Sequence, residues 1–235
     1  MEAIKIQSGA PHDYAQQRKE RFLTTHMPIR FDIEPSAEKD QVNSHVKKCF
    51  AEIYGAQVKT FEPYILSTFN ERGIVATIGF QPAATKKPLF LESYLDTPVE
   101  QTLTKCLNQP IDREKIVEVG NLSSSHKGSA SRILFILSVA ILHQAGFKWV
   151  TFTATKQVQR LLGKLNLETL PICEANPKRL ADQGASWGSY YDDKPMVVVG
   201  NLTDAIETLN AHKVIKSILE NYHKTISDAA ELIAI

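Results

Sequence analysis

The stretch that decides the fold is IVEVGNLSSSHKGSASR, residues 116–132. Its first part alternates β-branched and other residues as a strand with one buried face does, which places Glu118 on the face opposite the valines. A polar turn follows, and then an apolar run that ends near Gly146. We therefore predict a strand, a loop of small residues and a helix over about 129–145.

A loop in this position suits an anion. The first N–H groups of a helix have no partner within it, and the helix dipole adds partial positive charge behind them, so phosphate is a frequent occupant. The spacing matches neither a Walker loop nor GxGxxG, and an ordinary turn before a helix remains the alternative. The residues expected to contact the bound group are Asn121, Leu122, Ser123, His126, Lys127, Gly128, Ser129, Ala130, Ser131 and Arg132.

The order of this strand, the turn, the long helix and a further strand over 148–153 is similar to the acyl-CoA-binding half of the GNAT acyltransferases. In that superfamily a Q/R-x-x-G-x-G/A turn grips the CoA pyrophosphate. Residues 125–130, SHKGSA, keep the glycine and the alanine but lack the leading Gln or Arg. The resemblance implies an α/β fold, with a GNAT-like mixed central sheet flanked by helices. It also implies a CoA or phosphopantetheine thioester as donor substrate, with no tightly bound cofactor.

Five segments taken together resemble the bacterial thermostable hemolysin family. They are LFLESYLDTPVEQ (89–101), EVGNLSS (118–124), FTAT (152–155), ANPKRL (175–180) and WGSYY (187–191). That family looks like a distant relative of GNAT enzymes and of acyl-homoserine-lactone synthases, whereas its name implies membrane damage. The resemblance thus leaves rival hypotheses: an acyltransferase, a lytic or membrane-interacting protein, and an acyl-CoA- or phosphate-binding module without catalysis.

The composition is that of an ordinary soluble protein. The chain has 235 residues, of which 43% are hydrophobic and 23% charged, and a net charge of +1 gives no overall attraction to nucleic acid. No secretory signal is visible, and the apolar run 133–142 is shorter than the roughly 20 residues that span a bilayer. The cysteines Cys49, Cys106 and Cys173 lack the paired spacing of a metal site. We expect a cytoplasmic protein without a transmembrane segment, nucleic-acid partner or metal.

Three parts follow one another along the chain. Residues 1–40 read as a partly irregular extension, 41–202 as the GNAT-like α/β domain, and 203–235 as a C-terminal helical segment with a broad apolar stripe. This stripe either packs on its own domain, which we favour, or forms a homodimer. The elements expected within these parts are helices over 37–54, 99–106 and 156–165, a hairpin of strands 64–69 and 74–80, and strands near 29–33 and 196–199.

Transfer of an acyl group from acyl-CoA or an acyl carrier protein to a small amine requires a base, a donor to the carbonyl oxygen and a proton for the thiolate. Glu118 is the predicted base, because GNAT enzymes often carry a carboxylate in this region; a structural carboxylate is an equal alternative. A backbone N–H near Asn121 or Leu122 is the expected donor. Tyr190 and Tyr191 are the candidate acids, unless both are core anchors.

The acceptor site is expected to contain carboxylates and aromatic rings. Glu92, Asp96 and Glu100 lie near one another in sequence, which suits a cationic acceptor, although a solvated acidic face is the alternative. Trp187 precedes the two tyrosines in a loop-like segment, and Thr153 belongs to the strand after the long helix. We assign these five residues to substrate binding.

Overall fold

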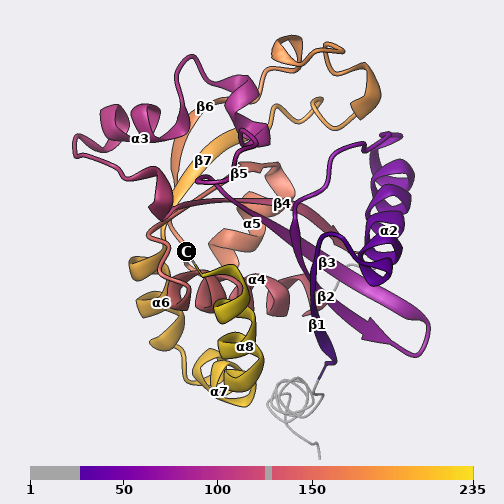
Figure 1. Cartoon of the computed structure of the whole chain (residues 1–235), viewed down its shortest axis with the longest axis vertical. Coiled ribbons are helices and arrows are strands. Elements are labelled where there is room, and N and C mark those ends of the chain that lie inside the picture. The colour runs from indigo at the N-terminus through magenta and orange to yellow at the C-terminus, as the bar shows by residue number, and fades with distance from the viewer. Residues whose placement is uncertain (1–26, 125–128, 235) are drawn as a thin grey trace, which may run out of the picture.

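A computed structural model describes residues 27–124 and 129–234. Its centre is a seven-stranded mixed sheet with the strand order β1-β2-β3-β4-β5-β7-β6 (Figure 1). Only β4 and β5 run parallel; the other neighbouring strands are antiparallel. The strands are β1 (Ile29–Ile33), β2 (Tyr64–Asn70), β3 (Gly73–Pro82), β4 (Ile116–Ser124), β5 (Trp149–Ala154), β6 (Leu170–Glu174) and β7 (Met196–Asn201).

Helices cover both faces of this sheet. The long helix α4 lies against β2, β3 and β4 on one face, and α6, α7 and α8 pack on its outer side, while α2 covers the other face (Figure 1). The helices are α2 (Ala37–Tyr54), α3 (Val99–Leu107), α4 (Ser129–Gln144), α5 (Lys156–Lys164), α6 (Leu202–Asn210), α7 (Lys213–Asn221) and α8 (His223–Ile233). The predicted α/β architecture is therefore confirmed.

The main core surrounds α4. Leu134, Leu137 and Ile141 are completely buried, because the sheet covers one side of the helix and the C-terminal helices cover the other. A helix that is apolar on all sides needs such a two-sided environment. Leu209 and Ile226 of the C-terminal segment belong to the same core. Within the described ranges, no helix combines the length and the apolar character of a membrane span.

The sheet opens between β4 and β5. Their pairing covers only Ile116 to Val119 of β4, although β4 continues to Ser124. Immediately beyond, the register between β3 and β4 shifts, and Asn121 takes a positive φ of 47°. Such a bulge places two residues opposite one and bends the strand. The bend carries the end of β4 away from its parallel neighbour.

Candidate active site

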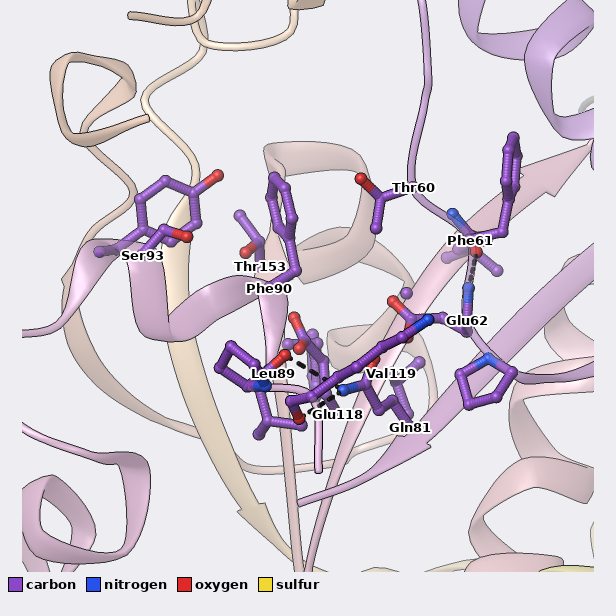
Figure 2. Close-up of a pocket in the computed structure, with 18 of the residues that line it drawn as sticks. Thr60, Phe61, Glu62, Gln81, Leu89, Phe90, Ser93, Glu118, Val119 and Thr153 are labelled. Carbon is purple, nitrogen blue, oxygen red and sulfur yellow. Dashed lines mark hydrogen bonds between the residues drawn. The ribbon is translucent and has the colours of Figure 1, made fainter. Parts of the chain in front are cut away.

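A cavity of about 550 Å³ lies where β4 and β5 separate. Loops before β2 and after β3, the short helical turn Phe90–Tyr94 and the segment around Trp187 close its other sides. Figure 2 shows Glu62, Gln81, Glu118 and Val119 together in this cavity, with Phe90 and Thr153 nearby. The β4 and β5 residues in its lining are Glu118, Val119, Gly120, Asn121, Leu122, Phe152 and Thr153.

Glu118 is a buried carboxyl in this lining, with a side chain only 3% exposed. Its Oε1 accepts a hydrogen bond from the Leu91 N–H at 3.0 Å, whereas Oε2 has no partner among the described residues. Burial raises the pKa of Glu118 well above its usual range, and the nearby charge of Glu62 adds to this, against hydrogen bonds from backbone N–H groups. Glu118 therefore holds a proton more tightly than an ordinary glutamate.

Gln81 fixes the segment that contacts Glu118. It is the register partner of Glu118 on β3, and its Nε2 donates to the carbonyl oxygens of Lys87 and Pro88 at 3.1 and 3.2 Å. These bonds hold the chain just before the turn that presents the Leu91 N–H. The orientation of Glu118 thus depends on a side chain from the neighbouring strand.

Glu62, which the sequence analysis did not single out, is a second buried carboxyl of the cavity, 7% exposed. Burial raises the pKa of Glu62 to about 7, with the charge of Lys39 acting in the opposite direction. Its backbone N–H donates to Asn121 Oδ1 at 2.7 Å. A Cβ at Gly79 would lie 2.7 Å from the Glu62 Cβ, and one at Gly120 would collide with its Oε1. The paired glycines therefore make the space that Glu62 occupies.

Aromatic rings form one wall of the cavity. The Trp187 ring lies 5.4 Å from Phe90 and 5.2 Å from Tyr190, centroid to centroid, and all three rings line the cavity. Tyr191 does not line the cavity, but its hydroxyl forms a hydrogen bond with the hydroxyl of Tyr94, and Tyr94 is part of the lining. Burial raises the pKa of both predicted acids, in Tyr191 to about 12, so both hydroxyls keep their protons at neutral pH.

The three acidic residues expected at the acceptor site each pair with arginine. Arg113 binds Glu92 at 2.7 Å and Glu100 at 2.6 Å, and Arg179 binds Asp96 at 2.7 Å. None of the three carboxylates is part of the cavity lining. Their charges are compensated within the chain, so we leave them out of the proposed site.

Part of the predicted phosphate loop is described. His126, Lys127 and Gly128 lie outside the described residues, and Ser129, Ala130, Ser131 and Arg132 begin α4. Ala130 is buried in the main core, and the buried Arg132 Nε has no hydrogen-bond partner among the described residues.

Three further residues of the predicted phosphate loop, Asn121, Leu122 and Ser123, belong to β4 and have different environments. Ser123 is buried and exchanges a hydrogen bond with the Thr77 hydroxyl at 2.8 Å, whereas Asn121 and Leu122 reach the cavity. Within residues 27–124 and 129–234, no group of three or more His, Cys, Asp or Glu side chains is arranged to hold a metal ion.

The fold is that of GNAT-like acyltransferases. Its mixed sheet opens between the parallel strands β4 and β5, and the long helix α4 is the next element after β4. FeeM, an N-acyl amino acid synthase from uncultured soil microbes, shares this fold with a TM-score of 0.56 and 12% identity over 80% of this chain and 98% of that one. The acyl-homoserine lactone synthase LasI aligns with a TM-score of 0.51 and 11% identity, over 76% and 91%. The CoA-dependent acyl-homoserine lactone synthase BjaI, in a structure with SAM and isopentyl-CoA, aligns with a TM-score of 0.51 and 11% identity, over 79% of this chain and 88% of that one.

The sequence also matches a profile of a named family. The thermostable hemolysin family profile covers residues 34–206, so the chain belongs to that family. This confirms the resemblance drawn from the five sequence segments. No curated protein matches the chain. At the low identities of the structural neighbours, their likeness shows the fold, and the activity must be argued from the cavity.

Proposed function

We propose that the protein is an acyltransferase that moves an acyl group from a thioester to an amine. Glu118 carries this proposal, because it combines burial, a raised pKa and an unpartnered oxygen at the opening between β4 and β5. A carboxyl whose pKa lies nearer neutrality is a stronger base than an exposed one. The fold supports the same reaction class, since its relatives include an N-acyl amino acid synthase and a CoA-dependent acyl-homoserine lactone synthase.

Three groups have roles in the reaction. Glu118 takes a proton from the ammonium group of the acceptor, and the free amine attacks the thioester carbonyl. An N–H of the bulge at Asn121 or Leu122 donates to the carbonyl oxygen as its negative charge grows. Tyr190, partly buried and protonated, donates to the departing sulfur and regains a proton from the new amide nitrogen.

The donor is proposed to be acyl-CoA or an acylated carrier protein. The sequence-predicted loop before α4 would bind the phosphate of its pantetheine arm, with Ser129 to Arg132 at the start of the helix. The cavity runs along β4 from Glu118 to Leu122 and reaches the aromatic wall. We assign Trp187 and Thr153 to the acceptor side, where an apolar ring and a hydroxyl line the same space.

Donor binding is tested first by thermal shift with CoA, acetyl-CoA and a long-chain acyl-CoA. A ligand at 100 times its dissociation constant adds about 2.7 kcal/mol to stability. We expect stabilisation that a Gly128→Val variant reduces. If none of the three compounds shifts the melting temperature, CoA is not the donor and acylated carrier protein replaces it in the assay.

Catalysis is tested by thiol release from the donor that binds, across a panel of primary amines. Glu118→Gln is expected to lower turnover by about 100-fold or more, the usual contribution of a general base, while donor binding persists. Glu71→Gln, on the exposed turn between β2 and β3, is the matched control. Equal turnover in Glu118→Gln and wild type would exclude Glu118 as the base. Leakage of lipid vesicles without thiol release would favour a lytic protein.

A further inference from the structure

The mechanism above leaves one buried carboxyl of the cavity unused. Glu62 precedes β2 and is separated by more than fifty residues from Glu118, yet both line the same space (Figure 2). A buried carboxyl without a strong partner is costly, so its retention calls for a physical reason. The fold accommodates it specifically, through glycines on two neighbouring strands.

The glycines place the Glu62 carboxyl beside Glu118. Gly120 is two residues after Glu118, on the same face of β4, and Gly79 is its register partner on β3. The Glu62 carboxyl lies over Gly120, because its Oε1 occupies the position that a Cβ there would need. Residues two apart on one face of a strand are neighbours. The charge of Glu62 accordingly affects the ionisation of Glu118.

A buried cation acts on Glu62. Lys39 of α2 is 1% exposed, and its Nζ lies 3.5 Å from Glu34 Oε2 in the connection between β1 and α2. Its charge also favours the ionised form of Glu62. The other titratable groups that influence the pair are Glu92, Tyr94 and Tyr190, and the pKa of each tyrosine is raised first by burial. Glu34, Tyr54, Lys86 and Lys87 also line the cavity. The charge of Lys39 is already paired with Glu34, and the like charges of Glu62 and Glu118 oppose ionisation of both at once.

We propose that Glu62 is the second carboxyl of the base: Glu62 and Glu118 together hold one proton, and the singly charged pair accepts the proton of the acceptor ammonium. This proposal rests on the proposed function. Two like-charged groups this close titrate as a pair, in two steps. Glu62 then acts in catalysis together with Glu118.

The protons balance over one turnover. The ammonium loses its first proton to the pair, which becomes neutral, and the amine nitrogen forms the bond to the carbonyl carbon. When the carbon–sulfur bond breaks, the second nitrogen proton reaches the sulfur through Tyr190. The pair returns its extra proton to solvent, so the products are an amide, a thiol and one free proton.

The test compares the pH dependence of kcat/KM in wild type, Glu62→Gln and Glu62→Asp, measured by thiol release from acyl-CoA with a primary amine. In wild type this limb is the first ionisation of the pair. In Glu62→Gln only Glu118 can take the proton, and its carboxyl ionises less readily than that of Glu62, so we expect the acidic limb to move at least one pH unit higher. Glu62→Asp keeps the second carboxyl and should keep the wild-type limb. An unchanged limb in Glu62→Gln would overturn the proposal, since a purely structural role does not set that limb. Glu71→Gln serves as the control.

A second measurement does not depend on activity. Glutamate carboxyl carbons labelled with ¹³C are followed by NMR across the pH range in wild type and Glu62→Gln. We expect the Glu118 signal to titrate at lower pH in the variant; an unmoved signal would overturn the pairing, whether or not turnover is seen. If the two carboxyls titrate as a pair but no donor gives thiol release, the proposed function is rejected and the pairing of Glu62 with Glu118 is retained.

Discussion

Two pairs of carboxylates lie on the same face of the sheet, and only one of the pairs binds an arginine. Glu92 and Glu100 meet at Arg113, whereas Glu62 and Glu118 share a cavity without an arginine. Burial acts on Glu92 as well, but hydrogen bonds from Arg113 and from the N–H groups of Val99 and Leu89 outweigh it and lower its pKa. The pKa values of Glu62 and Glu118 are raised. A carboxylate paired with a guanidinium therefore has a lowered pKa and a structural role, whereas a buried carboxyl without such a partner has a raised pKa that suits proton transfer.

The largest effect is expected from removing that guanidinium. Arg113→Met leaves Glu92 and Glu100 close together without a counterion, and loss of one partner of a partly buried ion network costs about 3 kcal/mol. Urea unfolding at pH 7 measures the change. Arg113 helps to lower the pKa of Glu92 in the folded protein, so its contribution is full above the usual glutamate range and is lost as the pH falls through the lowered pKa. The gap between variant and wild type should therefore narrow as unfolding is repeated at progressively lower pH; an equal gap at every pH would contradict the ion-pair explanation.

A second contrast concerns pH. Folding raises the pKa of Glu62 from 4.5 to about 7. Its contribution to stability is complete below pH 4.5 and is lost as the pH rises through 7, a change of about 3 kcal/mol. Glu62→Gln should therefore gain stability over wild type between pH 5 and pH 8, as measured by urea unfolding at both values. Parallel pH curves for the two proteins would show that Glu62 is not buried in its neutral form.

A smaller effect is expected at the glycine that houses Glu62. Gly120→Ala brings a Cβ into the Glu62 carboxyl, and such overpacking costs about 2 kcal/mol. In a Glu62→Ala background the same substitution should cost much less, because the colliding atoms are gone. A double-mutant cycle of unfolding free energies measures this coupling. Additive costs would place the strain elsewhere.

The smallest effect is expected at the exposed ion pair between Asp96 and Arg179. The side chain of Asp96 is 88% exposed, and its ion pair with Arg179 is open to water. Asp96→Asn should change the unfolding free energy by about 0.5 kcal/mol or less. A thermal melt beside Arg113→Met tests this, and comparable losses in the two variants would show that burial does not set the strength of these pairs.

Local patterns predicted the centre of the fold closely. The strand, loop and helix expected over 116–145 correspond to β4 and α4, whose bounds are Ile116–Ser124 and Ser129–Gln144. The continuous apolar run of 133–142 indicated a fully buried element, and its length together with Gly146 favoured a helix. The strand at Leu170–Glu174 was not predicted, since it lies at the sheet edge next to β7 and carries a proline. The C-terminal segment, expected to be helical, consists of the three helices α6, α7 and α8.

The site was less accessible from sequence. Glu118 was found because it precedes a recognisable loop. Glu62 lies in an unremarkable stretch, and its environment is formed by residues distant in sequence: Gly79 and Gly120 lie against it, and the charge of Lys39 acts on it. One signal was present: an isolated glycine within a strand indicates a close approach of another group. Pairing with arginine is likewise invisible in sequence, so the assignment of Glu92, Asp96 and Glu100 to the acceptor did not take their arginine partners into account.

The facing glycines also constrain how this protein can change over evolution. A lineage that replaces Gly79 or Gly120 while Glu62 is present must pass through a strained intermediate. One that first shortens Glu62 can then fill the space at Gly120, where the colliding atoms belong to the far end of the side chain, and an added side chain there makes the return of a glutamate harder. Loss of the second carboxyl would thus tend to be irreversible, and the three positions should be inherited as a unit.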